Sequence, residues 1–239
     1  MNLIKEQWTN CDIVPFLEYL STFQQTDKET WARKILNTKL KLLVIPTKEI
    51  YEIKNQILLG NYISYLNLEI FDHYEAIAIY GGLLTKIPDF PVMVTYLSKY
   101  LNVMENWAHC DILSFPIKPH LYQDYLSLSL EYSKDQRPFV RRLSLMILFQ
   151  MGKDKAVLPV IYERLLELKE EQEYYVIMMA GWLLCECIIQ HKAETLSFLI
   201  SHKELNKKIV NKAIQKCRES RRFTQEEKEE LLMLKKNLF

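Results

Sequence analysis

The chain has 239 residues, of which 49% are hydrophobic, and its 31 basic and 30 acidic residues give a formal net charge of +1. A chain of this length and apolar content can bury a substantial core. The balanced charge excludes a polybasic tail protein, so any nucleic-acid surface must come from local clusters of Lys and Arg. Only five glycines are present, and they form neither common glycine-rich phosphate loop. We therefore expect no nucleotide cofactor, and no cofactor of any kind.

The cysteines are odd in number and scattered along the chain: Cys11, Cys110, Cys185, Cys187 and Cys217. They have no paired metal-ligand spacing among themselves or with the histidines, so we expect reduced thiols, no metal site and a cytoplasmic location. The N-terminus lacks a basic region followed by an apolar core, and we expect no secretory signal. The most apolar stretch is interrupted by Glu186 and is too short to span a bilayer. It predicts a buried central helix.

Apolar residues recur at helical spacing along the first half of the chain, with almost no alternation typical of strands. The pattern predicts helices over 26–43, 47–60, 74–87 and 91–104, of which the first is ended by Pro46. Thr47 is the expected N-cap of the second helix and Gly60 its end. Each helix is short and amphipathic, with linkers of a few residues.

The stretch ENWAHCDILSF, residues 105–115, places Trp107 and Asp111 four residues apart. On a helix, both side chains would project from the same face. One interpretation is a functional site. The other is a buried Trp beside an Asp that caps a helix. The neighbouring His109 is isolated, and we expect a partly exposed helix residue rather than a base.

The second half predicts further helices over 119–133, 137–152, 155–170, 173–191, 193–202, 204–220 and 224–238. A dozen or so helices joined by tight turns favour helix pairs stacked on one another over a closed bundle. We therefore predict an all-α fold, an α-solenoid in one domain over residues 1–239. The concave face of such a scaffold is the expected binding surface.

Basic residues cluster near the end of the chain, where residues 206–222 carry seven Lys and Arg against the single acid Glu219. Lys208, Lys212 and Lys216 would form one stripe along a helix. One interpretation is a solvated face balanced by the acidic segment that follows. The other is a ridge that tracks phosphates with little sequence preference. A second basic cluster, RPFVRR, opens the helix predicted over 137–152.

Four blocks in order, NWAHCD, FVRRLSLMILFQ, YYVIMMAGWLLCE and NKKIVNKAIQK, resemble bacterial DNA alkylation repair proteins of the AlkD family, which are built of HEAT-like helical repeats. The segment WARKILNTKLKLLVIPTKEIYEI looks like the opening helices of that family. The resemblance runs from about Trp31 to Lys216. It implies a monomer that acts on double-stranded DNA carrying alkylated purines.

The resemblance also implies roles for individual residues. Asp111 matches the catalytic carboxylate, and Trp107 and Trp182 match aromatic walls of a concave DNA-binding cleft. Arg142, or less closely Arg141, matches an arginine that holds the DNA backbone near the lesion. The implied activity is that of a monofunctional glycosylase, which hydrolyses the N-glycosidic bond of cationic N3- or N7-alkylpurines.

These residue types suit that chemistry. A purine alkylated at N3 or N7 is cationic and needs no general acid to leave, so one carboxylate can stabilise the oxocarbenium-like transition state and position water. Tryptophan faces favour a charged base through cation–π attraction.

The sequence departs from the family pattern at three places. Lys34 stands where an aromatic residue is common, and we assign it, with Lys208, Lys212 and Lys216, to the DNA backbone. The family's Leu-Gly segment appears as KLLVIP, without the glycine, and Cys185 replaces an arginine. The alternative is therefore an inactive paralogue that binds bent or branched DNA, or a protein partner.

Overall fold

The structure is a computed structural model that describes residues 1–238, except for the side chain of residue 237. Fourteen α-helices fill this part of the chain, and it contains no strand beyond an isolated bridge between Lys41 and His73. The predicted all-α fold is confirmed. The chain divides into two compact units, Met1–Pro116 and Ile117–Phe239, and the single domain over 1–239 stays a prediction.

The first unit contains seven α-helices and two short 3-10 helices. Their bounds are η1 Asn10–Asp12, α1 Ile13–Ser21, η2 Thr26–Lys28, α2 Glu29–Leu36, α3 Thr47–Leu58, α4 Tyr62–Leu66, α5 Tyr74–Leu84, α6 Phe90–Leu101 and α7 Trp107–Asp111. The core of this unit is α5, which packs against α3, α6 and α7. Every residue of α5 from Glu75 to Leu84 is buried, as its almost wholly apolar sequence requires.

The N-terminal segment is attached to this unit by three aromatic rings. Trp8 packs edge to face against Phe16 and Tyr65, with ring centroids 5.6 and 5.2 Å apart, and all three are at most 2% exposed. Offset and edge-to-face contacts of this kind add to the free energy gained by burying the rings. Residues before α1 are therefore part of the fold.

The predicted helix over 26–43 is too long, because α2 ends at Leu36. Asn37 adopts a left-handed backbone conformation with φ 50°, and the Arg33 side chain donates hydrogen bonds to the carbonyls of Thr38 and Leu40. These contacts end the helix and direct the chain into an extended segment. Likewise Thr47 is the first residue of α3 rather than its N-cap.

The second unit contains the remaining helices. Their bounds are η3 Pro119–Leu121, α8 Tyr122–Ser133, α9 Pro138–Met151, η4 Lys155–Val157, α10 Leu158–Glu167, η5 Leu168–Glu170, α11 Tyr174–Gln190, α12 Lys192–Ser201, α13 Lys207–Glu219 and α14 Gln225–Leu238. Each helix predicted for this half is confirmed, within a few residues at its ends.

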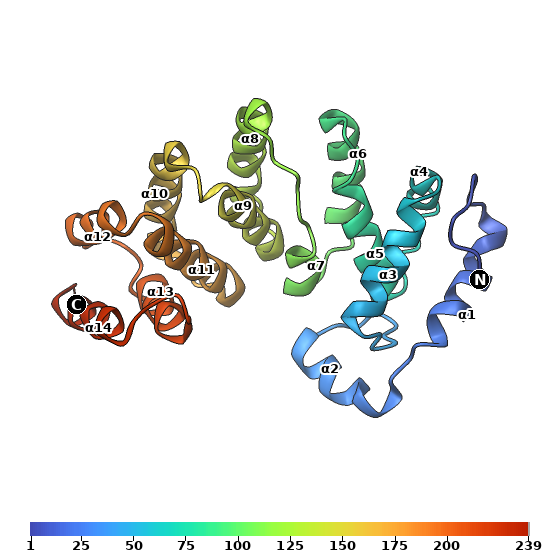
Figure 1. Ribbon diagram of the computed structural model, residues 1–239, viewed down its shortest axis with the longest axis horizontal. Helices are drawn as coiled ribbons and strands as arrows, with labels where there is room; N and C mark the ends of the chain where they lie inside the picture. The colour runs from blue at the N-terminus through green and yellow to red at the C-terminus, as the bar shows by residue number, and fades with distance from the viewer. Residues whose placement is uncertain (239) are drawn as a thin grey trace. The chain divides into compact units, whose positions relative to one another are not determined.

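Within this second unit, α9, α11 and α13 lie side by side, and α8 packs on α9 (Figure 1). Helices two apart in the sequence therefore form one layer, the pattern made by stacked helix pairs and consistent with an α-solenoid. The predicted concave cleft stays a prediction. Over the described residues, no helix has both the length and the apolar character needed to cross a membrane.

Candidate functional site

Trp107 and Asp111 are the first and last residues of the short helix α7. The helix begins there because Asn106, 1% exposed, accepts hydrogen bonds on Oδ1 from the amides of Ala108 and His109, each 3.0 Å long. The interpretation of a buried Trp beside a capping Asp is wrong, since Asn106 caps the helix and Trp107 is half-buried. Asp111 is half-buried too, one helical turn from Trp107.

The Trp107 ring is held against α2. Its Nε1 donates a hydrogen bond of 3.3 Å to the carbonyl of Ile35. The ring borders a groove of about 490 Å³, which is also lined by Trp31, Tyr74 and Glu75. Trp31 is 65% exposed, which is unusual for an aromatic side chain of this size. The groove therefore presents the apolar faces of aromatic rings beside the helix that carries Asp111.

Glu75 is a buried carboxylate among the residues that line this groove. Its Oε1 accepts hydrogen bonds from the amides of Leu43 and Ile45, at 3.0 and 3.4 Å. Burial raises the pKa of Glu75, and the backbone hydrogen bonds oppose that shift. Between the two amides lies Val44 with φ 56°, a left-handed conformation that glycine adopts without strain. Val44 belongs to the KLLVIP segment, which contains no glycine.

His109 is fully buried, so the expectation of a partly exposed residue is wrong. Its ring stacks on Tyr74 with centroids 4.5 Å apart, and Nε2 lies 3.2 Å from the Tyr74 carbonyl oxygen. Burial lowers the pKa of His109 to about 4, so the ring is neutral near pH 7 and Nε2 donates. The histidine therefore attaches α7 to α5. No sequence pattern indicated this contact, because Tyr74 and His109 are 35 residues apart.

In the second unit, Trp182 lies near two cations. The Arg142 guanidinium is 6.0 Å from its ring centroid and the Lys216 ammonium 5.7 Å, within cation–π range. Arg142 is only 4% exposed and donates a 2.8 Å hydrogen bond to the carbonyl of Tyr175, whereas Trp182 is 36% exposed. The structure thus brings together three predicted site residues from α9, α11 and α13. No sequence pattern predicts that they meet at one ring.

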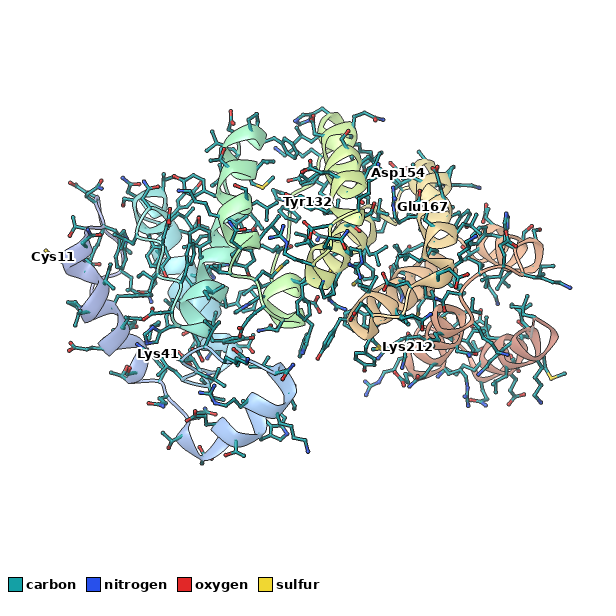
Figure 2. All side chains as sticks on the ribbon, turned by 180° about the vertical axis from the view of Figure 1, so that it is seen from behind. Cys11, Lys41, Tyr132, Asp154, Glu167 and Lys212 are labelled. Atoms are coloured by element: carbon teal, nitrogen blue, oxygen red, sulfur yellow. The ribbon has the colours of Figure 1, made fainter. Side chains whose placement is uncertain are left out.

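The lysine stripe of α13 lies close to the backbone of α11. A Cβ added at Gly181 would be 2.8 Å from Lys212 Cβ, so the helices can approach this closely only because residue 181 is glycine. Figure 2 labels Lys212 on α13 at this approach. Lys208 and Lys212 donate to the neutral amides of Gln172 and Gln215. Lys216 pairs with Glu219 at 3.1 Å. Two of the three lysines therefore keep their positive charge uncompensated by these contacts.

The remaining predicted residues lie in different settings. Arg141 donates from Nε to Glu171 at 3.1 Å and from Nη1 to the carbonyls of Asp135 and Gln136, so it ties α9 to the chain around it. Lys34 is exposed on α2. Contacts of either residue with DNA stay predictions. Among the described residues, no three His, Cys, Asp or Glu side chains gather as metal ligands would.

Comparison with known proteins gives one finding. The family model described as DNA alkylation repair enzyme matches residues 72–217. This range includes Trp107, Asp111, Arg142, Trp182 and Lys216, and it leaves out α2 with Trp31 and Lys34. No curated protein and no solved structure gives a significant match.

Proposed function

Because the chain belongs to the family of DNA alkylation repair enzymes, we propose that it is a monofunctional DNA glycosylase that removes N3- and N7-alkylated purines from duplex DNA. The observation that carries the proposal is the placement of Asp111 on one face of α7 with Trp107. A carboxylate beside an aromatic surface suits a reaction in which positive charge moves from the base to the sugar.

The proposed chemistry needs one carboxylate. The alkylated purine leaves as a neutral base, so the breaking bond shifts its positive charge to the deoxyribose. An Asp111 carboxylate about 4 Å from that charge would stabilise it by roughly 4 kcal/mol at an effective dielectric constant of 20. The same carboxylate would orient the attacking water towards the anomeric carbon. No metal ion or cofactor is required for these steps.

The charges around Trp182 support a different role for that ring. Arg142 and Lys216 already lie at cation–π distance from it, and they would repel a cationic base. The same pair attracts a phosphodiester. We therefore assign Trp182 to the deoxyribose-phosphate backbone of the DNA, and Trp107 to the lesion. Lys208 and Lys212 continue the positive charge along α13. Lys34 and Arg141 are the other proposed backbone contacts.

The test is release of 7-methylguanine and 3-methyladenine from methylated duplex DNA by the wild type and by Asp111→Asn. The neutral amide should lower the single-turnover rate by about 100- to 1000-fold, the effect of losing about 3–4 kcal/mol of transition-state stabilisation. Asp124→Asn is the matched control, because Asp124 is an exposed aspartate of the second unit. It should retain the wild-type rate.

The same experiment separates the proposal from its alternative. Duplex binding without base release by the wild type would contradict the glycosylase and leave a protein that binds DNA without cleaving it. Equal release by the wild type and Asp111→Asn would support a glycosylase but remove Asp111 from its mechanism. Circular dichroism of each variant would verify that the helices remain folded.

A further inference from the structure

Two buried cysteines of the second unit touch one another. The Sγ atoms of Cys185 on α11 and Cys217 on α13 are 3.3 Å apart. The residues are 7% and 0% exposed, and both are free thiols. They are 32 residues apart in the sequence, and they meet because α11 and α13 pack against each other.

The contact makes the two thiols unequal. The Cys217 thiol donates a hydrogen bond to Cys185 Sγ, and this bond lowers the pKa of Cys185. Arg222 and Lys216 act in the same direction, whereas burial and Glu186 oppose it. The same hydrogen bond and burial raise the pKa of Cys217. Cys185 therefore carries more thiolate character, and it is also the one with some exposed surface.

We propose that Cys185 and Cys217 are an oxidation site, at which a peroxide converts the thiol pair into a reversible disulfide. The Cys185 thiolate attacks one peroxide oxygen and becomes a sulfenic acid, while the other oxygen leaves as water after taking up a proton. The Cys217 sulfur then attacks the Cys185 sulfur, and the hydroxyl leaves as a second water. Two thiols and one hydrogen peroxide thus give one disulfide and two waters, and a dithiol reductant reverses the change.

The movement needed is small. A disulfide has sulfurs about 2.05 Å apart, so the 3.3 Å separation has to shorten by about 1.3 Å. Rotation of the two short side chains can supply most of this shift. Cys187 is a poor competitor, because burial raises its pKa to about 12 and a residue two positions along a helix faces away from Cys185.

The bond would join the two helices that carry the basic group around Trp182. Cys185 is one turn beyond Trp182 on α11, and Cys217 follows Lys216 on α13. Cross-linking residues about 30 apart restricts the unfolded chain, so the oxidised protein should melt about 5–10 °C higher than the reduced one. This inference does not depend on the proposed glycosylase activity.

The experiment exposes the reduced full chain to one to five equivalents of hydrogen peroxide, followed by denaturation and alkylation of the remaining thiols with N-ethylmaleimide. We use Cys11→Ser as the background, because Cys11 is the exposed cysteine and would otherwise form bonds between chains. Intact mass spectrometry should give two fewer labels per chain and a loss of 2 Da. Peptide mapping should identify a disulfide-linked pair of peptides, one containing Cys185 and the other Cys217. Treatment with dithiothreitol before alkylation should restore all four labels.

Matched variants separate this pair from other cysteines. Cys187→Ser should still lose two labels. Cys217→Ser and Cys217→Ala should form no disulfide and should lose at most the single label of Cys185, as its sulfenic acid, with unchanged helical circular dichroism. Four retained labels in the background protein at five equivalents of peroxide would overturn the proposal. So would peptides that join Cys185 to Cys187. Because the label count is made on a protein with both cysteines in place, it tests the proposal even if the Cys217 variants fold poorly.

Discussion

The approach of α13 to α11 at Gly181 predicts an unusual result for a substitution that normally stabilises helices. Glycine to alanine inside a helix is favourable by about 1 kcal/mol. At residue 181, however, the new Cβ would lie 2.8 Å from Lys212 Cβ and 3.3 Å from the Ala213 amide nitrogen. The optimal van der Waals separation of non-bonded carbon atoms is about 3.5–4.0 Å, so α13 must move by about 1 Å.

The size of the effect follows from which atoms collide. Lys212 Cβ and the Ala213 nitrogen are fixed to the backbone of α13 and cannot rotate away. We therefore take a cost of about 2–3 kcal/mol, in the upper part of the range for overpacked contacts. After subtracting the gain in helix propensity, Gly181→Ala should lower the free energy of unfolding by about 1–2 kcal/mol. The melting temperature should fall by about 2–8 °C.

The assay is urea unfolding of Gly181→Ala beside Gly152→Ala, followed by circular dichroism. Gly152 ends α9 with φ −64°, and a Cβ there would meet nothing closer than the Phe149 carbonyl at 3.4 Å. This control should match the wild type or exceed it by up to about 1 kcal/mol. Equal stability of the wild type and Gly181→Ala would refute the argument that glycine is needed for the helix spacing.

Two further predictions concern protonation and charge. Burial lowers the pKa of His109 to about 4. As the pH falls, this histidine is therefore protonated in the unfolded chain at a higher pH than in the folded chain. Its contribution to stability is complete above about pH 6.5 and is lost as the pH falls towards 4, by up to about 3 kcal/mol. His109→Gln should flatten this part of the curve in chemical unfolding at several pH values, whereas substitution of the exposed His120 should not. For the basic stripe of Lys208, Lys212 and Lys216, replacing all three lysines by Gln should reduce the slope of log K for duplex binding against log salt concentration by about 2.7. An unchanged slope would place the stripe outside the DNA contact. The control replaces the exposed Lys118, Lys153 and Lys203 instead.

The fold was predictable where helical periodicity had no competitor. Helical spacing of apolar residues predicts the helix over 137–152, and α9 matches it closely. The helix over 26–43 was predicted too long, since Leu40 and Leu43 continue the helical spacing. A long-range contact determines the backbone conformation there, because the amide of Leu43 donates a hydrogen bond to the side chain of Glu75, 32 residues further along. Spacing within a window cannot detect such a partner.

For the candidate site residues, the sequence indicated neighbours within one helix but not contacts between helices. The four-residue spacing placed Trp107 and Asp111 on one helical face, and α7 confirms that they share a helix. The predicted buried central helix is confirmed as well, since Cys185 and Cys187 of α11 are buried. The meeting of Arg142, Trp182 and Lys216 depends on how three helices pack. It is a tertiary property that no short motif carries.

The two cations that lie against Trp182 have a consequence for how a repair enzyme of this kind would choose its targets. A ring that faces Arg142 and Lys216 offers a phosphodiester the same attraction on damaged and intact DNA. The DNA affinity contributed by the second unit would then be nearly the same for damaged and intact DNA. Selectivity would arise instead from the base itself, because only an alkylated purine is a good enough leaving group to depart during a brief encounter. Normal DNA would be held and released unharmed at the same sites.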